Sequence, residues 1–242
     1  MDDSDTEAAL VIAIRTGDLD TVRRLVEEVP GLAVRPLGVA GGRTPLHIAT
    51  DWPGYFPHAP STARILLDAG ADPNWRGDGP KAETALHWAA SSDDVDVADV
   101  LIEGGADMEV AGGSIGTPLD NAIGYGCWNV ARRLVERGAR VEKLWHAAAL
   151  GLTARLDELL TAGPSTEDLD EAFWQACAGG QLRAAQALLR AGANPQARPE
   201  YAQQRDLLDV VRGSDTRRDL LLNWLREQGV PAVPDDDEPA TI

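Results

Sequence analysis

The sequence is poor in cysteine, in lysine and in long apolar runs. Its two cysteines, Cys127 and Cys177, lie in alanine-rich stretches and match no metal-ligand spacing. No apolar run approaches the roughly 20 residues that a membrane helix needs. The opening Met1-Asp2-Asp3 is acidic, whereas a secretory signal begins with positive charge. We therefore expect a protein of the reduced cytoplasm that has no membrane partner and binds no metal.

Positive charge is scarce as well. Lysine and arginine number 22 against 39 aspartates and glutamates, so the formal net charge is −17. Such a surface repels nucleic acid and anionic lipid, and it favours a basic or neutral partner. Part of the charge lies in Asp235-Asp236-Asp237-Glu238, and residues 231–242 are expected to form an acidic disordered tail. The low lysine count beside abundant alanine, arginine and aspartate favours a bacterial source.

A repeat dominates the remaining sequence. Glycines follow the similar stretches "LLDA", "LIEG" and "LVER", and Gly70, Gly105 and Gly138 lie 35 and 33 residues apart. Each glycine supplies the left-handed conformation that ends a helix. Upstream, Thr44 and Thr84 are helix caps that precede "PLH" and "ALH". The sequence therefore predicts helix pairs repeated at about 33 residues.

The segments "GRTPLHIA", "ETALHWAA", "GTPLDNAI" and "LLDAGADPN" carry a resemblance to a known family. They resemble the helix opening and the second-helix ending of the ankyrin-repeat family, and the likeness extends over roughly residues 5–230. The resemblance implies an all-α fold, a solenoid of about seven helix pairs with short β-turn fingers and a concave inner face. It says almost nothing about activity.

The units at the two ends depart from the repeat. We expect a single domain over residues 5–230, with a capping unit at 5–33, repeats over 42–198 and a second capping unit at 202–230. No room for a finger exists between Glu142 and Leu144, and an acidic linker with Ser165 or Thr166 as a helix cap replaces the next finger. We also expect a monomer.

Stacked repeats place equivalent positions in spatial rows along the concave face. His47 and His87 occupy the position at which the family uses a histidine to tie neighbouring turns together, so their role is expected to be structural. The next row holds large or polar residues, and the row before each turn holds small ones, which together describe a recess with apolar walls and a few polar anchors. Trp88 stands among small neighbours as one wall of this recess, although it also suits packing between two repeats.

An insertion, "DWPGYFPHAP", makes the turn of the second repeat about six residues longer than its neighbours. Its exposed rings are expected to cover the recess, unless they pack on each other instead. The predicted contact residues come from this loop and from the rows of the concave face: Asp51, Trp52, Tyr55, Phe56, Trp88, Ser91, Ser92, Asn121, Tyr125, His146 and Gln175.

The predicted function is an interaction protein that binds a protein segment or small molecule in this groove. Trp52, Trp88 and Tyr125 supply apolar contacts, and Asp51 a negative anchor. The alternative is an enzyme with Asp51 and His146 as an acid/base pair under a lid. "GVAGGRT" lacks the lysine and the spacing of a phosphate loop, and Cys127 lacks a neighbouring histidine. We therefore assign no catalytic residue and no cofactor, and a binding role is favoured over an enzyme.

Overall fold

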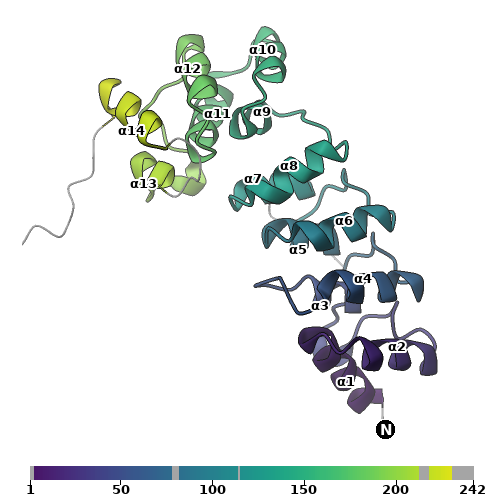
Figure 1. Cartoon of the computed structure of the whole chain (residues 1–242). Coiled ribbons are helices and arrows are strands. Elements are labelled where there is room, and N and C mark those ends of the chain that lie inside the picture. Colours follow the sequence, from purple (N-terminus) through teal and green to yellow (C-terminus); the bar gives the residue numbers. More distant parts are fainter. Residues whose placement is uncertain (1–2, 78–81, 114, 213–217, 231–242) are drawn as a thin grey trace, which may run out of the picture. The chain divides into compact units, whose positions relative to one another are not determined.

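The computed structural model describes residues 3–77, 82–113, 115–212 and 218–230 (Figure 1). Over these ranges the chain forms fourteen α-helices in seven consecutive pairs and no β-strand. Two isolated antiparallel bridges, Leu37 with Arg43 and Gly112 with Gly116, lie in two of the fingers. The all-α class and the seven helix pairs are thus confirmed. The acidic tail predicted for residues 231–242 lies outside the described ranges.

The chain divides into two compact units, Met1–Arg140 and Val141–Ile242, where the sequence predicted one domain over residues 5–230. The division falls just before the place where the sequence has no room for a finger, between Glu142 and Leu144. The change of unit therefore coincides with a change in the repeat.

The first unit is a stack of four helix pairs, which Figure 1 shows in sequence order from purple to teal. Within it, α1 packs on α3, α5 on α7, and α4 on both α2 and α6. None of the described helices in either unit combines the length and apolar character needed to cross a bilayer. The helices of the first unit are α1 (Asp3–Thr16), α2 (Leu19–Glu28), α3 (Pro45–Ala49), α4 (Ala59–Asp68), α5 (Ala85–Ser91), α6 (Val95–Glu103), α7 (Pro118–Gly124) and α8 (Trp128–Glu136), with a 3-10 turn η1 (Gly38–Ala40).

Thr44 and Thr84 are the N-cap residues of α3 and α5, as the sequence predicted, although the Thr44 side chain makes no capping hydrogen bond. Thr117 and Asp120 form a capping box at α7, in which the Thr117 N–H donates to Asp120 Oδ2 at 2.7 Å. Proline fills the first position of α3 and α7, where no N–H is required. Asp94 is the N-cap residue of α6, and its carboxylate accepts from the Val97 N–H at 3.2 Å. Each capping hydrogen bond satisfies a donor that a helix start leaves unpaired.

Buried histidines join neighbouring repeats, as the sequence predicted. The His47 Nε2–H donates to the Glu83 carbonyl at 3.0 Å, and the His87 Nε2–H donates to the Gly116 carbonyl at 3.0 Å. The His87 Nδ1 accepts from the Thr84 N–H, which fixes the proton on Nε2. Burial lowers the pKa of both imidazoles from 6.5. Both rings are therefore neutral structural links at neutral pH.

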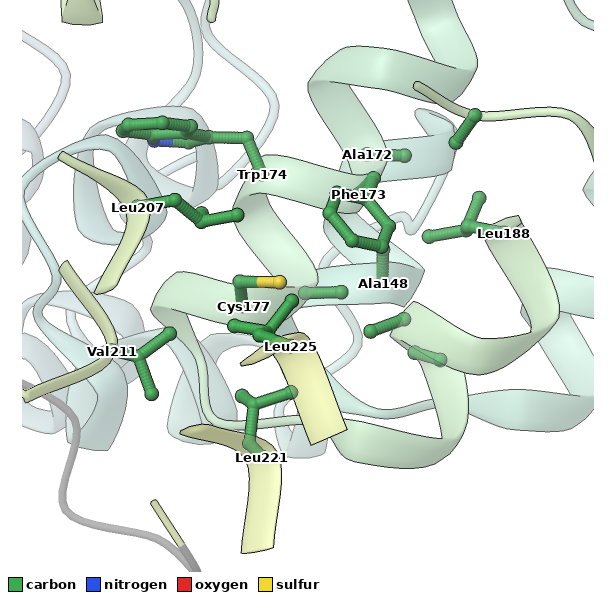
Figure 2. Packing of buried hydrophobic residues seen from close by; sticks show 14 of the residues in the cluster. Ala148, Ala172, Phe173, Trp174, Cys177, Leu188, Leu207, Val211, Leu221 and Leu225 are labelled. Carbon is green, nitrogen blue, oxygen red and sulfur yellow. The ribbon is translucent and has the colours of Figure 1, made fainter. Parts of the chain in front are cut away.

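The second unit encloses its own core around Phe173 (Figure 2). Trp174 and Cys177 lie on the same helix and are buried beside it, while Leu188 comes from the paired helix. Ser165 begins this helix with a capping box, as one of the two residues proposed for that role. The helices are α9 (Leu144–Leu150), α10 (Thr153–Thr161), α11 (Thr166–Ala178), α12 (Leu182–Ala191), α13 (Leu207–Arg212) and α14 (Arg218–Glu227), with a 3-10 turn η2 (Glu200–Ala202).

Candidate functional site

A hollow of about 370 Å³ opens on the first unit, and six of the predicted contact residues line it. We call it the aromatic recess. It is bounded by residues of three consecutive repeats: Thr50, Asp51, Trp52, Glu83, Trp88, Ser91, Ser92 and Tyr125. Equivalent positions of stacked units thus meet at one place, as the rows of the repeat predicted.

Helix ends position these side chains. Asp51 and Trp52 follow the end of α3, Trp88 lies on α5, and Tyr125 follows α7. The rim is open to solvent, because Trp52 is 80% exposed and Tyr125 is 57% exposed. The small side chain of Ser91 leaves room beside Trp88. The recess is therefore an open shelf with aromatic edges rather than a lidded cavity.

The Trp88 ring both packs between repeats and contributes to the recess. The His47 imidazole stands edge-on to the Trp88 ring, with 4.9 Å between the ring centroids. The Arg43 guanidinium lies over the same indole, 5.8 Å from its centroid. Trp88 is half-buried as a result. The two interpretations offered for Trp88 by the sequence therefore both apply.

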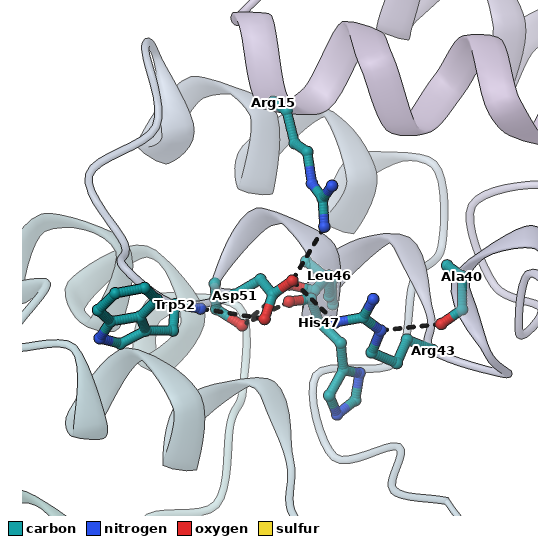
Figure 3. A network of polar contacts seen from close by, with 8 residues as sticks. Arg15, Ala40, Arg43, Leu46, His47, Asp51 and Trp52 are labelled. Atoms are coloured by element: carbon teal, nitrogen blue, oxygen red, sulfur yellow. Dashed lines mark hydrogen bonds and ion pairs between the residues drawn. The ribbon is translucent and has the colours of Figure 1, made fainter.

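Asp51 is bound to two arginines and is not the free negative anchor that the sequence predicted. Its Oδ2 accepts from Arg43 at 2.8 Å and from Arg15 at 3.1 Å, while its Oδ1 accepts from the Trp52 N–H at 3.0 Å (Figure 3). Figure 3 shows Asp51 lying between Trp52 and Arg43. The carboxylate thus joins α1 to the second repeat and holds the start of the insertion loop.

The insertion loop, residues 51–58, is fastened to the neighbouring repeats. Nine residues, 50–58, separate α3 from α4, against three, 92–94, between α5 and α6, which confirms the predicted six extra residues. The Tyr55 N–H donates to Asp94 Oδ2 at 3.0 Å, and its hydroxyl donates to the Asp93 carbonyl. Gly54 lies so close to Ser92 that an added Cβ would be 2.9 Å from the serine Cβ.

The predicted lid is consequently wrong in two of its three residues. Tyr55 binds the turn between α5 and α6, and neither it nor the half-buried Phe56 lines the recess. On the other side of the loop, a Cβ at Gly17 would collide with the Pro57 carbonyl, and Gly17 has a φ of 72°. Because its neighbours hold it on both sides, the loop contributes only Asp51 and Trp52 to the lining, and Trp52 is its one aromatic residue there.

Asn121 lies beneath the recess and not on its surface, which corrects its prediction as a contact residue. It is 0% exposed because α7 packs against α5. Its Nδ2 donates to Glu83 Oε1 at 2.9 Å and to Ser91 Oγ at 3.3 Å. Asn121 therefore positions two residues of the recess from the following repeat.

Glu83 is the residue of the recess that sequence reasoning missed. It directly precedes the Thr84 cap, in the position that Arg43 holds one repeat earlier. Glu83 lines the recess, and Arg43 lies over the ring of Trp88, which is another lining residue. The sequence does contain a signal for Glu83, because a charged residue precedes the helix cap in two successive repeats. The rows used to predict contact residues did not include this position.

His146 and Gln175 belong to the second unit and are buried there, so their predicted role as partner contacts is wrong. His146 is 3% exposed and its ring stands edge-on to Trp145, 4.3 Å between centroids. The Gln175 Nε2 donates to the Tyr201 hydroxyl oxygen at 2.9 Å. Both residues are buried because α9 and α11 pack against each other.

The cysteines are packed thiols. Cys127 is buried at the start of α8, where desolvation, with a smaller contribution from Asp93, raises its pKa to about 11. Burial also raises the pKa of Cys177. A thiol that stays protonated at neutral pH is a poor nucleophile.

Comparison with known proteins identifies the repeat. The family model "Ankyrin repeats (3 copies)" matches residues 1–77 and 56–143. Neurogenic locus notch homolog protein 1 of Danio rerio is 32% identical in an alignment 142 residues long, which covers 47% of this chain and only 6% of that protein.

Solved structures show the same fold. The human ASB11 ankyrin repeat domain matches with a TM-score of 0.54 at 20% identity, over 93% of this chain and 99% of that one. The ankyrin repeat domain of Bcl-3, described as a unique member of the IkappaB protein family, matches with a TM-score of 0.50 at 24% identity, over 90% and 97%. At these identities the likeness concerns the fold.

Proposed function

The chain belongs to the ankyrin-repeat family, whose repeats generally mediate protein–protein interaction, and we propose that it binds a segment of a partner protein in the aromatic recess. One observation carries the proposal: six residues chosen from the rows of the repeat line a single open hollow. Exposed tryptophan and tyrosine side chains are typical anchors of protein interfaces.

A protein segment suits this recess better than an enclosed small molecule. The lining includes the exposed rings of Trp52 and Tyr125, so the hollow is open to solvent. An extended chain can cross such a shelf and insert one side chain into it. The acid/base alternative is not carried forward, because Asp51 is held by two arginines and His146 is buried in the second unit.

The test is selection of a displayed library of random peptides against the full chain. We expect binding peptides whose affinity falls at least about 30-fold for Trp52→Ala, the loss typical of an aromatic anchor. Trp52→Ala is an informative variant because so exposed a side chain contributes little to the stability of the fold. Leu220→Ala, which removes an exposed side chain from α14, is the control and is expected to bind like the parent. Selected peptides that bind Trp52→Ala unchanged would refute the proposal.

A further inference from the structure

We infer that the aromatic recess recognises a basic side chain, so that the partner segment presents a lysine or arginine to Glu83 between Trp52 and Tyr125. The inference rests on the proposed function and names the chemistry of the group that enters. It depends on three features of the recess: an unpaired carboxylate, exposed aromatic rings, and an internal example of the same arrangement.

The first feature is the carboxylate of Glu83. It lines the hollow, and no arginine, lysine or histidine of the described ranges forms an ion pair with it. One carboxylate oxygen, Oε1, accepts a hydrogen bond from the Asn121 Nδ2 at 2.9 Å. An apolar group placed over this carboxylate would remove water from a charge without replacing it, which is unfavourable. A cationic group restores the lost interaction through a charge-assisted hydrogen bond.

The second feature is the pair of exposed rings at the rim. Trp52 and Tyr125 are among the most exposed large side chains of the first unit, and both line the hollow. The face of an aromatic ring attracts a cation, and tryptophan does so most strongly. A long basic side chain also covers apolar surface with its methylene groups while its charged end reaches a carboxylate. Lysine and arginine therefore match both parts of the site.

The third feature is an arrangement that the chain already contains beside the recess. The Arg43 guanidinium lies over the Trp88 ring at 5.8 Å while it is paired with Asp51 at 2.8 Å. A ring, a carboxylate and a cation thus occur together within the same two repeats. Glu83 with the exposed rings offers the same combination with the cation missing among the described residues. The net charge of −17 adds a long-range attraction for a basic segment.

The experiment compares the peptides selected by three full-length proteins: the parent, Glu83→Gln and Glu27→Gln. The amide of Glu83→Gln still accepts from Asn121, so only the charge is lost. Glu27→Gln removes one charge from the exposed side of α2 and is the matched control. We expect the parent and Glu27→Gln to enrich lysine or arginine at one peptide position about tenfold. In Glu83→Gln this enrichment is expected to fall to near unity while peptides still bind.

Each other result overturns the inference. Peptides that need Trp52 but show no basic preference, or a basic preference that Glu83→Gln retains, refute the basic ligand and leave the proposed function intact. Selection of acidic peptides would assign recognition to Arg15 and Arg43 instead. Peptides that bind the parent and Trp52→Ala equally would refute the proposed function and the inference together.

Discussion

Asn121 of the fourth repeat donates from its buried amide to Glu83 of the third, 2.9 Å from nitrogen to oxygen. The same amide nitrogen donates to Ser91. One interior side chain thereby sets the position of two residues that line the aromatic recess. The site is therefore a property of stacked repeats and does not exist within any one of them.

Replacing Asn121 by alanine should destabilise the first unit and weaken peptide binding. The change removes a hydrogen bond to a charged group and leaves a small void, and we expect a loss of about 2 kcal/mol in the free energy of unfolding. Urea unfolding of the full chain measures it. Asn223→Ala, an exposed asparagine on α14, should change stability by less than about 0.5 kcal/mol. Equal effects of the two changes would contradict the supporting role of Asn121.

Asp93 should stabilise α8 from the turn of the preceding repeat. Its carboxylate accepts from the Val130 N–H at 2.9 Å and from Asn129 Nδ2 at 2.7 Å, while Cys127 at the helix start provides no side-chain cap. The backbone φ of Asp93 is 55°, and Gly126, which occupies the equivalent position in the next repeat, has a φ of 73°. We expect Asp93→Gly to cost about 1 kcal/mol through the lost cap, and Asp93→Ala about 1 kcal/mol more through the left-handed backbone.

Thermal unfolding of the two Asp93 variants separates these contributions. If alanine proved as stable as glycine at this position, the left-handed conformation would not constrain it. If neither differed from the parent, the cap on α8 would have no energetic effect.

Stability should fall as pH drops below about 6.5 because of the buried histidines. Burial lowers the pKa of His47 and His87 from 6.5, so the unfolded chain binds protons that the folded chain does not. Their contribution is present above pH 6.5 and is lost on acidification. Melting temperatures between pH 7.5 and 5.5 should therefore decline, and His87→Gln should show a lower starting value but a shallower decline. A slope that stays the same in His87→Gln contradicts this account.

Cys127 should resist alkylation in the folded chain. Its pKa of about 11 exceeds the value of 9.0 for an unperturbed thiol, so its thiolate fraction at pH 8 is roughly a hundredfold lower. Mass spectrometry after iodoacetamide treatment should show slow labelling in native protein and rapid labelling in urea. Asp93→Asn removes a neighbouring charge that raises this pKa and should speed native labelling. Labelling at equal rates in native and unfolded protein would refute the assignment.

Much of the fold could be predicted because its signals are local. A threonine cap with proline after it, and a glycine in the left-handed conformation, act within a few residues, so they mark helix starts and ends without knowledge of the neighbours. Trp52, Trp88 and Tyr125 were grouped correctly because the repeat fixes equivalent positions in space. Glu83 was missed because the rows considered for contact positions lie within the helix and at its end, whereas Glu83 precedes the helix cap.

The errors arose where a neighbour decides the orientation of a side chain. Asn121 and Trp88 occupy the same row, yet α7 buries Asn121 against α5 while the Trp88 ring reaches the hollow. Tyr55 turns toward Asp93 because the loop is fastened to the next turn. His146 and Gln175 come after the point in the sequence where the finger is missing. Beyond that point the rows of the first unit no longer predict which side chains are exposed.

The most direct measurement follows the indole N–H signals of the seven tryptophans by NMR while a selected peptide is added to the full chain. We predict the largest shifts for Trp52 and Trp88, with Trp174 and Trp224 unchanged, because the first two line the aromatic recess and the others lie in the second unit. A bound peptide that shifts Trp174 or Trp224 and leaves Trp52 and Trp88 in place would contradict the recess as the binding site.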